Sequence, residues 1–323
     1  MQSLIQDVFL KAFSNSYLSQ LHDSAVVPIE GHRIAVTTDS YVVRPLFFPG
    51  GDIGSMAVHG TINDLAMSGA TPLYLTAGFI LEEGLPIETL QRIVTSMADA
   101  ARKAGVSIVC GDTKVVDRGK GDQIFINTTG IGHVPEHSDI GPHRIKEGDR
   151  ILVSGDLGSH GVAVMSVREG LTFASDVVSD SAPLHQVVAD LIQNDIPIHG
   201  MRDLTRGGLA SALNELAASS QQQFMINENR IPVQEPVRGA CEVLGLDPLY
   251  VANEGRFVLF VSASEGNKAL TILRKHSVSK LAMDIGDVIS SPRLHSPPVT
   301  LQTVVGTHRI LDLLSGEQLP RIC

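Results

Sequence analysis

Strand-like and helix-like segments alternate along the first half of the chain, and this alternation restricts the fold more than any other feature of the sequence. Apolar, β-branched runs predict strands, and apolar residues spaced three and four apart predict helices. Strands are expected at residues 33–38, 73–80, 106–110 and 124–134, and helices at residues 55–68 and 88–104. Gly69 and Gly105 directly follow the two helices, as is common at helix ends. The pattern is typical of an α/β or mixed α+β fold.

A turn-rich stretch at residues 136–150, EHSDIGPHRIKEGDR, separates this half from a second series of elements. In that series, strands are expected at residues 151–154, 257–262 and 284–289, and helices at residues 183–194, 205–219 and 266–275. A chain of 323 residues, 43% of them hydrophobic, is too long for one ordinary core. We therefore expect one domain at residues 1–145, a second at residues 146–305, and a mobile tail at residues 306–323.

Charge and hydropathy exclude several classes of partner. The net charge is −10, Trp is absent, and no stripe of Lys and Arg is present to neutralise a nucleic-acid backbone. No apolar run is long enough to span a membrane. The first 13 residues, MQSLIQDVFLKAF, predict an amphipathic helix and lack the features of a signal peptide. We expect a protein that binds neither nucleic acid nor membrane.

The three cysteines, Cys110, Cys241 and Cys323, form no CxxC pair and are odd in number. A reducing cytoplasm therefore fits better than a disulfide framework. Cys110 in a strand and Cys241 on an apolar helix face are expected to be core residues. Cys323 is the last residue, where a thiol has freedom to move, although a terminal cysteine can also be incidental.

Three aspartates lie where predicted elements end or meet turns. Asp39 ends a strand in TTDSY, Asp112 ends a strand in CGDTK, and Asp64 lies in GTINDLAMSGA. Ligands of α/β folds bind at the carboxyl ends of strands, and Mg²⁺ prefers carboxylate oxygens together with substrate phosphates. Each aspartate alone is better explained as a cap of a helix or turn. Together, Asp39, Asp64 and Asp112 predict a magnesium–nucleotide site.

Neighbours of these aspartates extend the predicted site. Asn63 and Thr113, each adjacent to an aspartate, are candidate nucleotide-binding residues with Asp64 and Asp112. Lys114 is placed either to neutralise a phosphate oxygen or to remain an ordinary solvated lysine.

Two glycine-rich turns are candidate phosphate sites. The turn GDLGSHG, which begins at Gly155 and includes Gly158, follows a strand and precedes a helix, so its N–H groups could approach a phosphate. A tight turn without ligand explains it equally well. In DLTRGG, Asp203 or Thr205 is suited to cap the next helix, while Arg206, Gly207 and Gly208 offer an anion pocket at its start.

Glu254, in ANEG between two predicted strands, is either a general base or a turn residue. On its own, the turn is the simpler interpretation.

These motifs resemble one family along nearly the whole chain. The segments TTDSYVVRPLFFPGGDIG, GTINDLAMSGA, GFILEEGLP, CGDTKVV, SGDLGSHG, RDLTRGG, ANEG and the terminal PRIC are similar to those of HypE, the [NiFe]-hydrogenase maturation factors. HypE belongs to the PurM-like ATP-binding superfamily, with aminoimidazole ribonucleotide synthetase and selenophosphate synthetase. The aspartate and TRGG motifs are shared across the superfamily, whereas the PRIC ending is specific to HypE.

The resemblance implies a fold and a reaction. The fold is a PurM-like two-domain structure whose first domain forms a β-barrel-like core across a homodimer. The carbamoyltransferase HypF places a carbamoyl group on the terminal thiol, here Cys323, and ATP with Mg²⁺ drives its dehydration to a thiocyanate. The cyano group then passes to iron on the HypC–HypD complex. Lys114 and Glu254 are both candidates to remove the proton from nitrogen.

Two alternatives and one departure accompany this resemblance. The alternatives are a related kinase such as selenophosphate synthetase, or a non-catalytic scaffold that presents its tail to maturation partners. HypE sequences usually begin with a glycine-rich segment that covers the nucleotide phosphates, whereas this sequence begins at MQSLIQDVF. Either the start is shortened or another element is expected to cover the phosphates.

Overall fold

The structure is a computed structural model that describes residues 12–13, 15–17, 20, 22–170, 177–290 and 298–313. The amphipathic helix expected at residues 1–13 lies outside the described residues, apart from its last two positions. Cys323 and the rest of the PRIC ending also lie outside them.

The first half forms a five-stranded mixed sheet in the order β1-β2-β7-β5-β6. Its strands are β1 (Ala25–Ile29), β2 (His32–Tyr41), β5 (Thr71–Glu82), β6 (Ser107–Val116) and β7 (Ile124–Val134). Neighbouring strands are antiparallel except β5 and β6, which are parallel and are joined through a helix. The sheet is open in the part of the chain that the structure describes, with β1 and β6 as its two edges.

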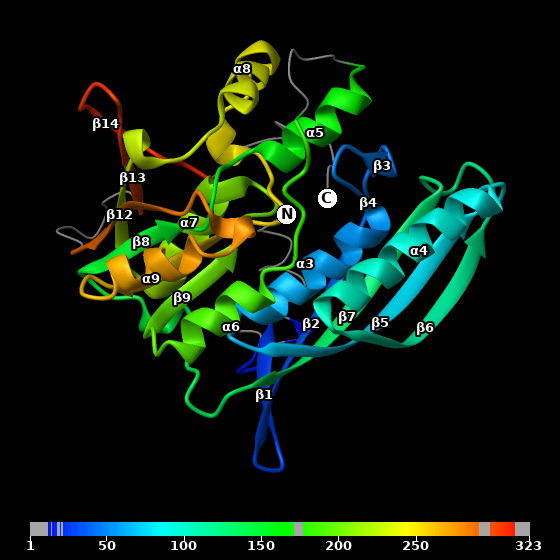
Figure 1. Ribbon diagram of the computed structural model, residues 1–323, viewed down its shortest axis with the longest axis horizontal. Helices are drawn as coiled ribbons and strands as arrows, with labels where there is room; N and C mark the ends of the chain where they lie inside the picture. The colour runs from blue at the N-terminus through cyan, green and yellow to red at the C-terminus, as the bar shows by residue number, and fades with distance from the viewer. Residues whose placement is uncertain are drawn as a thin grey trace.

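Two helices, α3 (Ile53–Met67) and α4 (Ile87–Ala104), lie along one face of this sheet (Figure 1). Asp52 caps α3 because its carboxylate accepts hydrogen bonds from the N–H groups of Gly54 and Ser55. A short hairpin, β3 (Phe47–Phe48) with β4 (Gly51–Asp52), precedes that cap. Gly105 ends α4 in the left-handed conformation at a φ of 72°, as its position in the sequence predicts.

The sequence prediction for the strand at residues 106–110 was wrong about burial. Strand β6 runs on to Val116 and is exposed along almost its whole length, because it lies at the sheet edge. Cys110 is therefore exposed instead of lying in the core, whereas Cys241 is buried as expected.

The second half forms a seven-stranded mixed sheet in the order β14-β13-β10-β12-β8-β11-β9. Its strands are β8 (Asp149–Val153), β9 (Ile198–Asp203), β10 (Gln223–Asn227), β11 (Phe257–Ser262), β12 (Met283–Ile289), β13 (Val299–Gln302) and β14 (His308–Ile310). Its helices are α5 (Ser159–Arg168), α6 (His185–Gln193), α7 (Gly208–Ser220), α8 (Glu235–Leu244) and α9 (Gly266–Leu273). The mixed α/β character expected from the sequence is confirmed.

Helix α3 joins the two halves. Ala66 and Met67, at its carboxyl end, share a hydrophobic cluster with Leu184 before α6 and with Phe257 in β11. Figure 1 shows α3 running between the first sheet and α6. Asp64, one turn before this contact, is thereby placed where the two halves meet.

Residues 306–313 of the expected tail are described, and they pack on the second half. Strand β14 pairs with β13, and Leu311 is fully buried in the second hydrophobic core. The Asn214 side chain donates a 2.8 Å hydrogen bond to the Leu311 carbonyl oxygen, and the Tyr250 hydroxyl donates one of 2.9 Å to that of Asp312. The chain is anchored as far as Asp312.

Candidate active site at an acidic cluster

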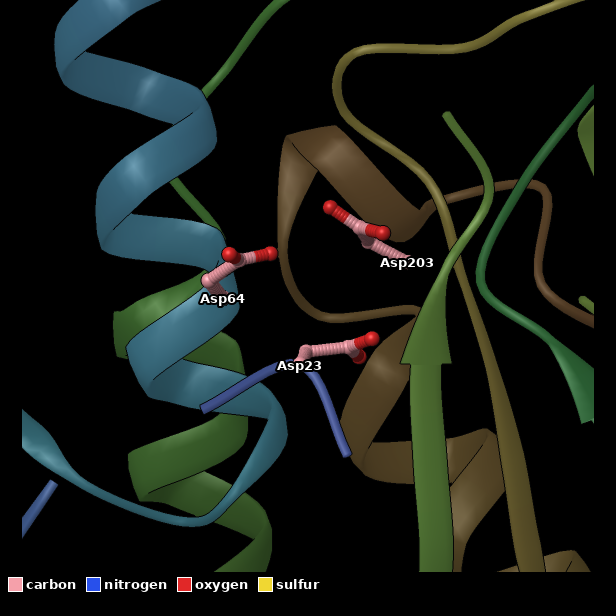
Figure 2. A group of neighbouring side chains, drawn as sticks. All are labelled: Asp23, Asp64 and Asp203. Carbon is pink, nitrogen blue, oxygen red and sulfur yellow. The ribbon is translucent and has the colours of Figure 1, made fainter. Parts of the chain in front are cut away.

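Three aspartates from distant parts of the chain converge where α3 meets the second sheet. Asp23 precedes β1, Asp64 lies in α3, and Asp203 ends β9. One carboxylate oxygen from each lies within 4.8 Å of the other two. Figure 2 shows the three side chains next to one another, reached from α3, from β9 and from the segment before β1. Three hard oxygen donors at this spacing are the ligand type that Mg²⁺ selects.

Burial makes this acidic cluster (Asp23, Asp64 and Asp203) electrostatically strained without a cation. Loss of solvent raises the pKa of Asp64 and of Asp203 well above the ordinary aspartate value, and neighbouring carboxylates raise both further. Within the described part of the chain, the buried Oδ2 of Asp23 has no hydrogen-bond partner. An orphaned carboxylate oxygen beside two like charges fits a divalent cation that all three would share.

Arg202 supplies part of the compensating charge. Its guanidinium Nε lies 3.2 Å from Asp23 Oδ1, and its other end forms an ion pair with Glu215 at 2.7 Å. Since Arg202 is shared with Glu215, it does not neutralise the whole cluster.

Asp39 stands beside the cluster, on β2. The Tyr41 hydroxyl donates a hydrogen bond of 3.1 Å to Asp39 Oδ2. Burial raises the pKa of Asp39, although this hydrogen bond opposes the rise. The Tyr41 hydroxyl oxygen also lies 3.1 Å from that of Thr61 in α3, so Asp39 faces the helix that carries Asp64.

Asp112 does not join them within one chain. The register aligns Asp39 with Thr128, Thr128 with Ala77, and Ala77 with Gly111, so Asp112 lies three strands away from Asp39. At about 4.8 Å per strand, the separation is roughly 14 Å, which is too far for a shared ion. The exposed Asp112 instead pairs with Lys114 at 3.2 Å, which lowers its pKa, and Thr113 lies between them on the same edge strand.

Asn63 has a different role from the predicted nucleotide contact. Its buried amide donates to the carbonyl oxygens of Ala182 and Glu254, at 3.0 and 3.2 Å, and its Oδ1 accepts the N–H of Leu184 at 2.8 Å. With donors and acceptor already used by main-chain groups, Asn63 links α3 to two loops of the second half.

The turn at Gly155 and Gly158 has two N–H groups that the protein's own side chains already bind, which favours the ligand-free turn of the two interpretations. Asn253 Oδ1 accepts the N–H of Gly158 at 2.7 Å, and Asp180 Oδ1 accepts that of His160 at 3.1 Å. A Cβ at Gly155 would press on the Arg256 side chain, so this glycine serves close packing. The protein's own acceptors occupy donors that a phosphate would need.

The second glycine turn keeps its suitability for an anion. Arg206 is exposed three residues after Asp203, and Gly207 adopts a φ of 78° immediately before α7. A Cβ at Gly208 would lie 2.7 Å from the carbonyl oxygens of Leu249 and Val251, so only glycine fits there. Arg206 and the amino end of α7 thus lie on the loop that also carries a cluster aspartate.

Glu254 faces the same region from the ANEG loop. It is 2% exposed, and its buried Oε1 has no hydrogen-bond partner among the described residues. Burial raises the pKa of Glu254 well above the ordinary value, and the charges of Asp203, Asp180 and Asp39 add to the rise. A nearby cation would favour its ionised form.

Sequence reasoning missed Asp23 and assigned Asp203 only a capping role. Asp203 carried a usable signal, because it ends a strand directly before a glycine-rich turn. Asp23 lies in HDS, before the first strand, where nothing in the sequence sets it apart.

Comparison with known proteins decides the family. Models of AIR synthase related proteins match residues 21–134 (N-terminal domain) and 146–296 (C-terminal domain). The carbamoyl dehydratase HypE of Azotobacter vinelandii is 52% identical over 323 residues, which cover 100% of this chain and 94% of that protein. The chain belongs to the HypE family of carbamoyl dehydratases.

Solved HypE structures share the fold. A HypE–HypF complex superposes with a TM-score of 0.90 at 48% identity, covering 96% of this chain and 99% of the other. HypE in complex with ATP superposes with a TM-score of 0.87 at 49% identity, covering 100% of this chain and 96% of the other. The acidic cluster and Glu254 therefore lie in a fold that this chain shares with a HypE solved in complex with ATP.

Proposed function

We propose that this chain uses ATP to dehydrate a carbamoyl group carried on the thiol of Cys323, which yields a protein thiocyanate for the cyanide ligand of [NiFe]-hydrogenase iron. The observation that carries the proposal is the buried acidic cluster in a member of the HypE family. Buried like charges are unfavourable unless a cation and its ligand use them.

The overall change is R–S–C(O)NH₂ plus ATP to R–S–C≡N plus ADP and phosphate. Amide oxygen is a poor leaving group, so transfer of the γ-phosphoryl group to it makes the C–O bond breakable. The nitrogen loses its two protons, and phosphate leaves with the oxygen. Mg²⁺ on Asp23, Asp64 and Asp203, beside Asp39, would supply positive charge against the ATP phosphates. Arg206, Gly207 and Gly208 are the proposed phosphate contacts of the chain itself.

Glu254 and Lys114 remain the candidates for removing protons from nitrogen. Glu254 lies beside the cluster in the same chain, and it accepts a proton only when the local positive charge keeps it ionised. Lys114 projects from the exposed edge strand β6, three strands across the sheet from β2, which carries Asp39, and reaches a site only if a second copy brings it there.

A homodimer is part of the proposal. The β6 edge and the sheet face opposite α3 and α4 expose apolar side chains at Tyr74, Ile80, Ile108, Val109 and Val115. An uncovered apolar edge of this kind invites pairing with another strand. Two copies joined there would build the barrel-like core, and Asp112, Thr113 and Lys114 of one copy would face the acidic cluster of the other.

The proposed domains are residues 1–145 and 146–305, with a tail that carries Cys323. The hydrogen-bonded Asp312 lies 11 residues before Cys323. At 3.3–3.6 Å per extended residue, the thiol can sweep a radius of about 36–40 Å. That radius serves both the chain's own active site and the proposed partners, HypF as carbamoyl donor and the HypC–HypD complex as cyanide acceptor.

The proposed compartment is the cytoplasm, where thiols remain reduced. Cys110 and Cys241 are both free, which agrees with this proposal. Among the described residues, none of the helices combines the length and the apolar composition that crossing a bilayer requires.

Mass spectrometry of the C-terminal peptide tests the function. After carbamoylation, Mg-ATP should reduce the peptide mass by about 18 Da, the mass of one water. Cys323→Ala should carry neither modification, and Asp64→Asn should be carbamoylated without losing water. An unchanged carbamoyl mass with Mg-ATP would refute dehydration. Dehydration at the normal rate in Asp64→Asn would favour a scaffold whose chemistry occurs elsewhere.

A further inference from the structure

Asp180 has no assigned role, yet its carboxylate lies at the base of the ANEG loop. The side chain is 1% exposed and belongs to the segment that precedes α6. Its Oδ1 accepts the N–H groups of His160 at 3.1 Å and Glu254 at 3.4 Å, and its Oδ2 accepts that of Gly255 at 3.2 Å. One buried carboxylate thus binds two consecutive amides at the candidate catalytic glutamate.

The opposite side of the same peptide is held from α3. The Asn63 amide donates to the carbonyl oxygen of Glu254 at 3.2 Å, while Asp180 receives the Glu254 N–H. The main chain of Glu254 is therefore fixed at both its donor and its acceptor. Nothing comparable holds its carboxyl group, since the buried Oε1 is unpartnered among the described residues.

Gly255 allows this close approach. A Cβ at that position would overlap the carbonyl oxygen of Asp180 and would lie 3.0 Å from its carbonyl carbon. Any larger residue would push the segment at Asp180 away from the ANEG loop. The segment and the loop fit together only with glycine there.

We propose that Asp180 is a positioning residue for Glu254. By fixing the main chain at Glu254 and Gly255, its carboxylate directs the free Glu254 carboxyl group toward the acidic cluster. Asp180 itself touches no reacting atom in this scheme. The inference rests on the proposed function, in which Glu254 acts on the carbamoyl group during dehydration.

A double-mutant cycle on the full-length protein tests the proposal. Asp180→Asn keeps the size of the side chain but weakens its hydrogen bonds with the N–H groups of Glu254 and Gly255. It should lower the kcat of dehydration by about 10- to 100-fold and leave the KM for ATP within about twofold. In a Glu254→Gln background, Asp180→Asn should cause no further loss, because it acts only through Glu254.

A matched control separates positioning from general damage. Asp149→Asn alters another carboxylate that is 1% exposed, here paired with His199 at 2.7 Å and distant from the ANEG loop in sequence. Its effect on kcat should be small and should be the same with and without Glu254→Gln. If the effect of Asp180→Asn on kcat is also the same with and without Glu254→Gln, the positioning proposal is overturned.

Amide hydrogen exchange gives a readout that is independent of turnover. Residues 251–258 should exchange faster in Asp180→Asn than in the unaltered protein, and Glu254→Gln should leave their exchange unchanged. Unaltered exchange in Asp180→Asn contradicts the proposal. If Asp180→Asn does not fold, Gly255→Ala replaces it in the double-mutant cycle. The added Cβ would push the main chain at Asp180 away from the ANEG loop.

The two hypotheses fail in different ways. If Glu254→Gln dehydrates the carbamoyl group at the full rate, Glu254 is not catalytic. The positioning role of Asp180 is then refuted as well, because it acts through Glu254. If Asp180→Asn lowers kcat by the same factor in the unaltered protein and in Glu254→Gln, only the positioning role of Asp180 is refuted.

Discussion

The Thr37 hydroxyl oxygen lies 2.7 Å from Asp64 Oδ2, which joins β2 to α3 beside the acidic cluster. The same hydroxyl oxygen lies 3.0 Å from the carbonyl oxygen of Asp23. One threonine thus fixes two members of the cluster relative to each other, although 41 positions separate them in the sequence. Such rigid placement is what a metal-binding set of carboxylates requires.

Mg²⁺ should stabilise this protein through the cluster. At a concentration 100-fold above its Kd, a ligand that binds only the folded state adds about 2.7 kcal/mol, which corresponds to several degrees in Tm. Asp203→Asn should abolish most of that increase, because it removes one carboxylate. The metal-free Asp203→Asn variant should be at least as stable as the unaltered protein, since a like charge is gone. Thermal unfolding with and without Mg²⁺ measures both effects, and an equal Mg²⁺ response in the variant would place the metal elsewhere.

Mixing two inactive variants should restore activity if Asp112 completes the partner's site. Asp64→Asn and Asp112→Asn should each fail to dehydrate the carbamoyl group. In a mixed dimer, one site carries both substitutions and the other carries neither, so a statistical mixture should recover about a quarter of full activity. Mass spectrometry after co-refolding counts the product. No recovery in verified mixed dimers would mean that Asp112 acts within its own chain or not at all.

His59 should make the protein less stable in mild acid. Burial, together with the charges of Lys103 and His185, lowers its pKa to about 4 from the ordinary 6.5, and its Nδ1 lies 3.1 Å from the Ser181 hydroxyl oxygen. Between those pH values the unfolded chain binds a proton that the folded chain does not bind. Stability therefore falls as pH falls from 6.5 towards 4, by up to about 3 kcal/mol.

His59→Gln should reduce this pH dependence. Urea unfolding at about pH 7 and about pH 4.5 compares the two proteins. His185, whose pKa is also lowered by burial, should leave a smaller residual slope in the variant. Identical slopes in both proteins would show that His59 is not the responsible group.

Arg256→Met should destabilise the turn before α5 strongly. The Arg256 guanidinium donates to Asp156 Oδ1 at 2.8 Å, and both side chains are largely buried. Burial opposes ionisation of Asp156, but Arg256 and the Gln234 side chain together outweigh burial, and the Asp156 pKa is lowered. Removing Arg256 leaves a buried charge unpaired, at a cost of about 3–5 kcal/mol.

Asp156→Asn in the Arg256→Met background should recover part of that loss, because the carboxylate nearer to Arg256 is then neutral, while Asp180, whose Oδ2 lies 3.8 Å from Arg256 Nε, still lacks its ion pair. Urea midpoints of the single and double variants provide the measurement. A double variant that is less stable than Arg256→Met would contradict the ion-pair explanation.

Lengthening the tail should slow delivery of the thiol. A Gly-Ser insertion of ten residues after Leu313 doubles the length of the segment that carries Cys323. The effective concentration of the thiol at the active site should then fall by about threefold, because it varies as the −3/2 power of the segment length. Single-turnover dehydration of the carbamoylated protein should slow by about that factor, while carbamoylation by HypF should not. An unchanged rate would show that chain closure does not limit the reaction.

The sequence alone was sufficient for the local structure and the family. Helix α4 ends at Gly105 as expected, because a left-handed residue at a helix end is a local requirement that the glycine itself reports. The motifs around Asp64 and Arg206 pointed to the PurM-like superfamily for a similar reason, and the terminal PRIC narrowed that resemblance to HypE. Each is a short contiguous segment whose residues act together.

Tertiary structure alone decided which aspartates meet. Asp112 ends a predicted strand as Asp39 does, but strand order places β6 at the far edge of the sheet, and strand order is not a local property. Asp23 carries no sequence signal and still completes the cluster, because the chain before β1 passes beside α3. The sequence suggested ligand contacts at Asn63, Gly155 and Gly158. In the folded chain, groups distant in sequence bind the Asn63 amide and the Gly158 N–H, and the Arg256 side chain packs against Gly155. Local preferences depend on neighbouring residues, whereas a shared ion depends on contacts that only the packed chain creates.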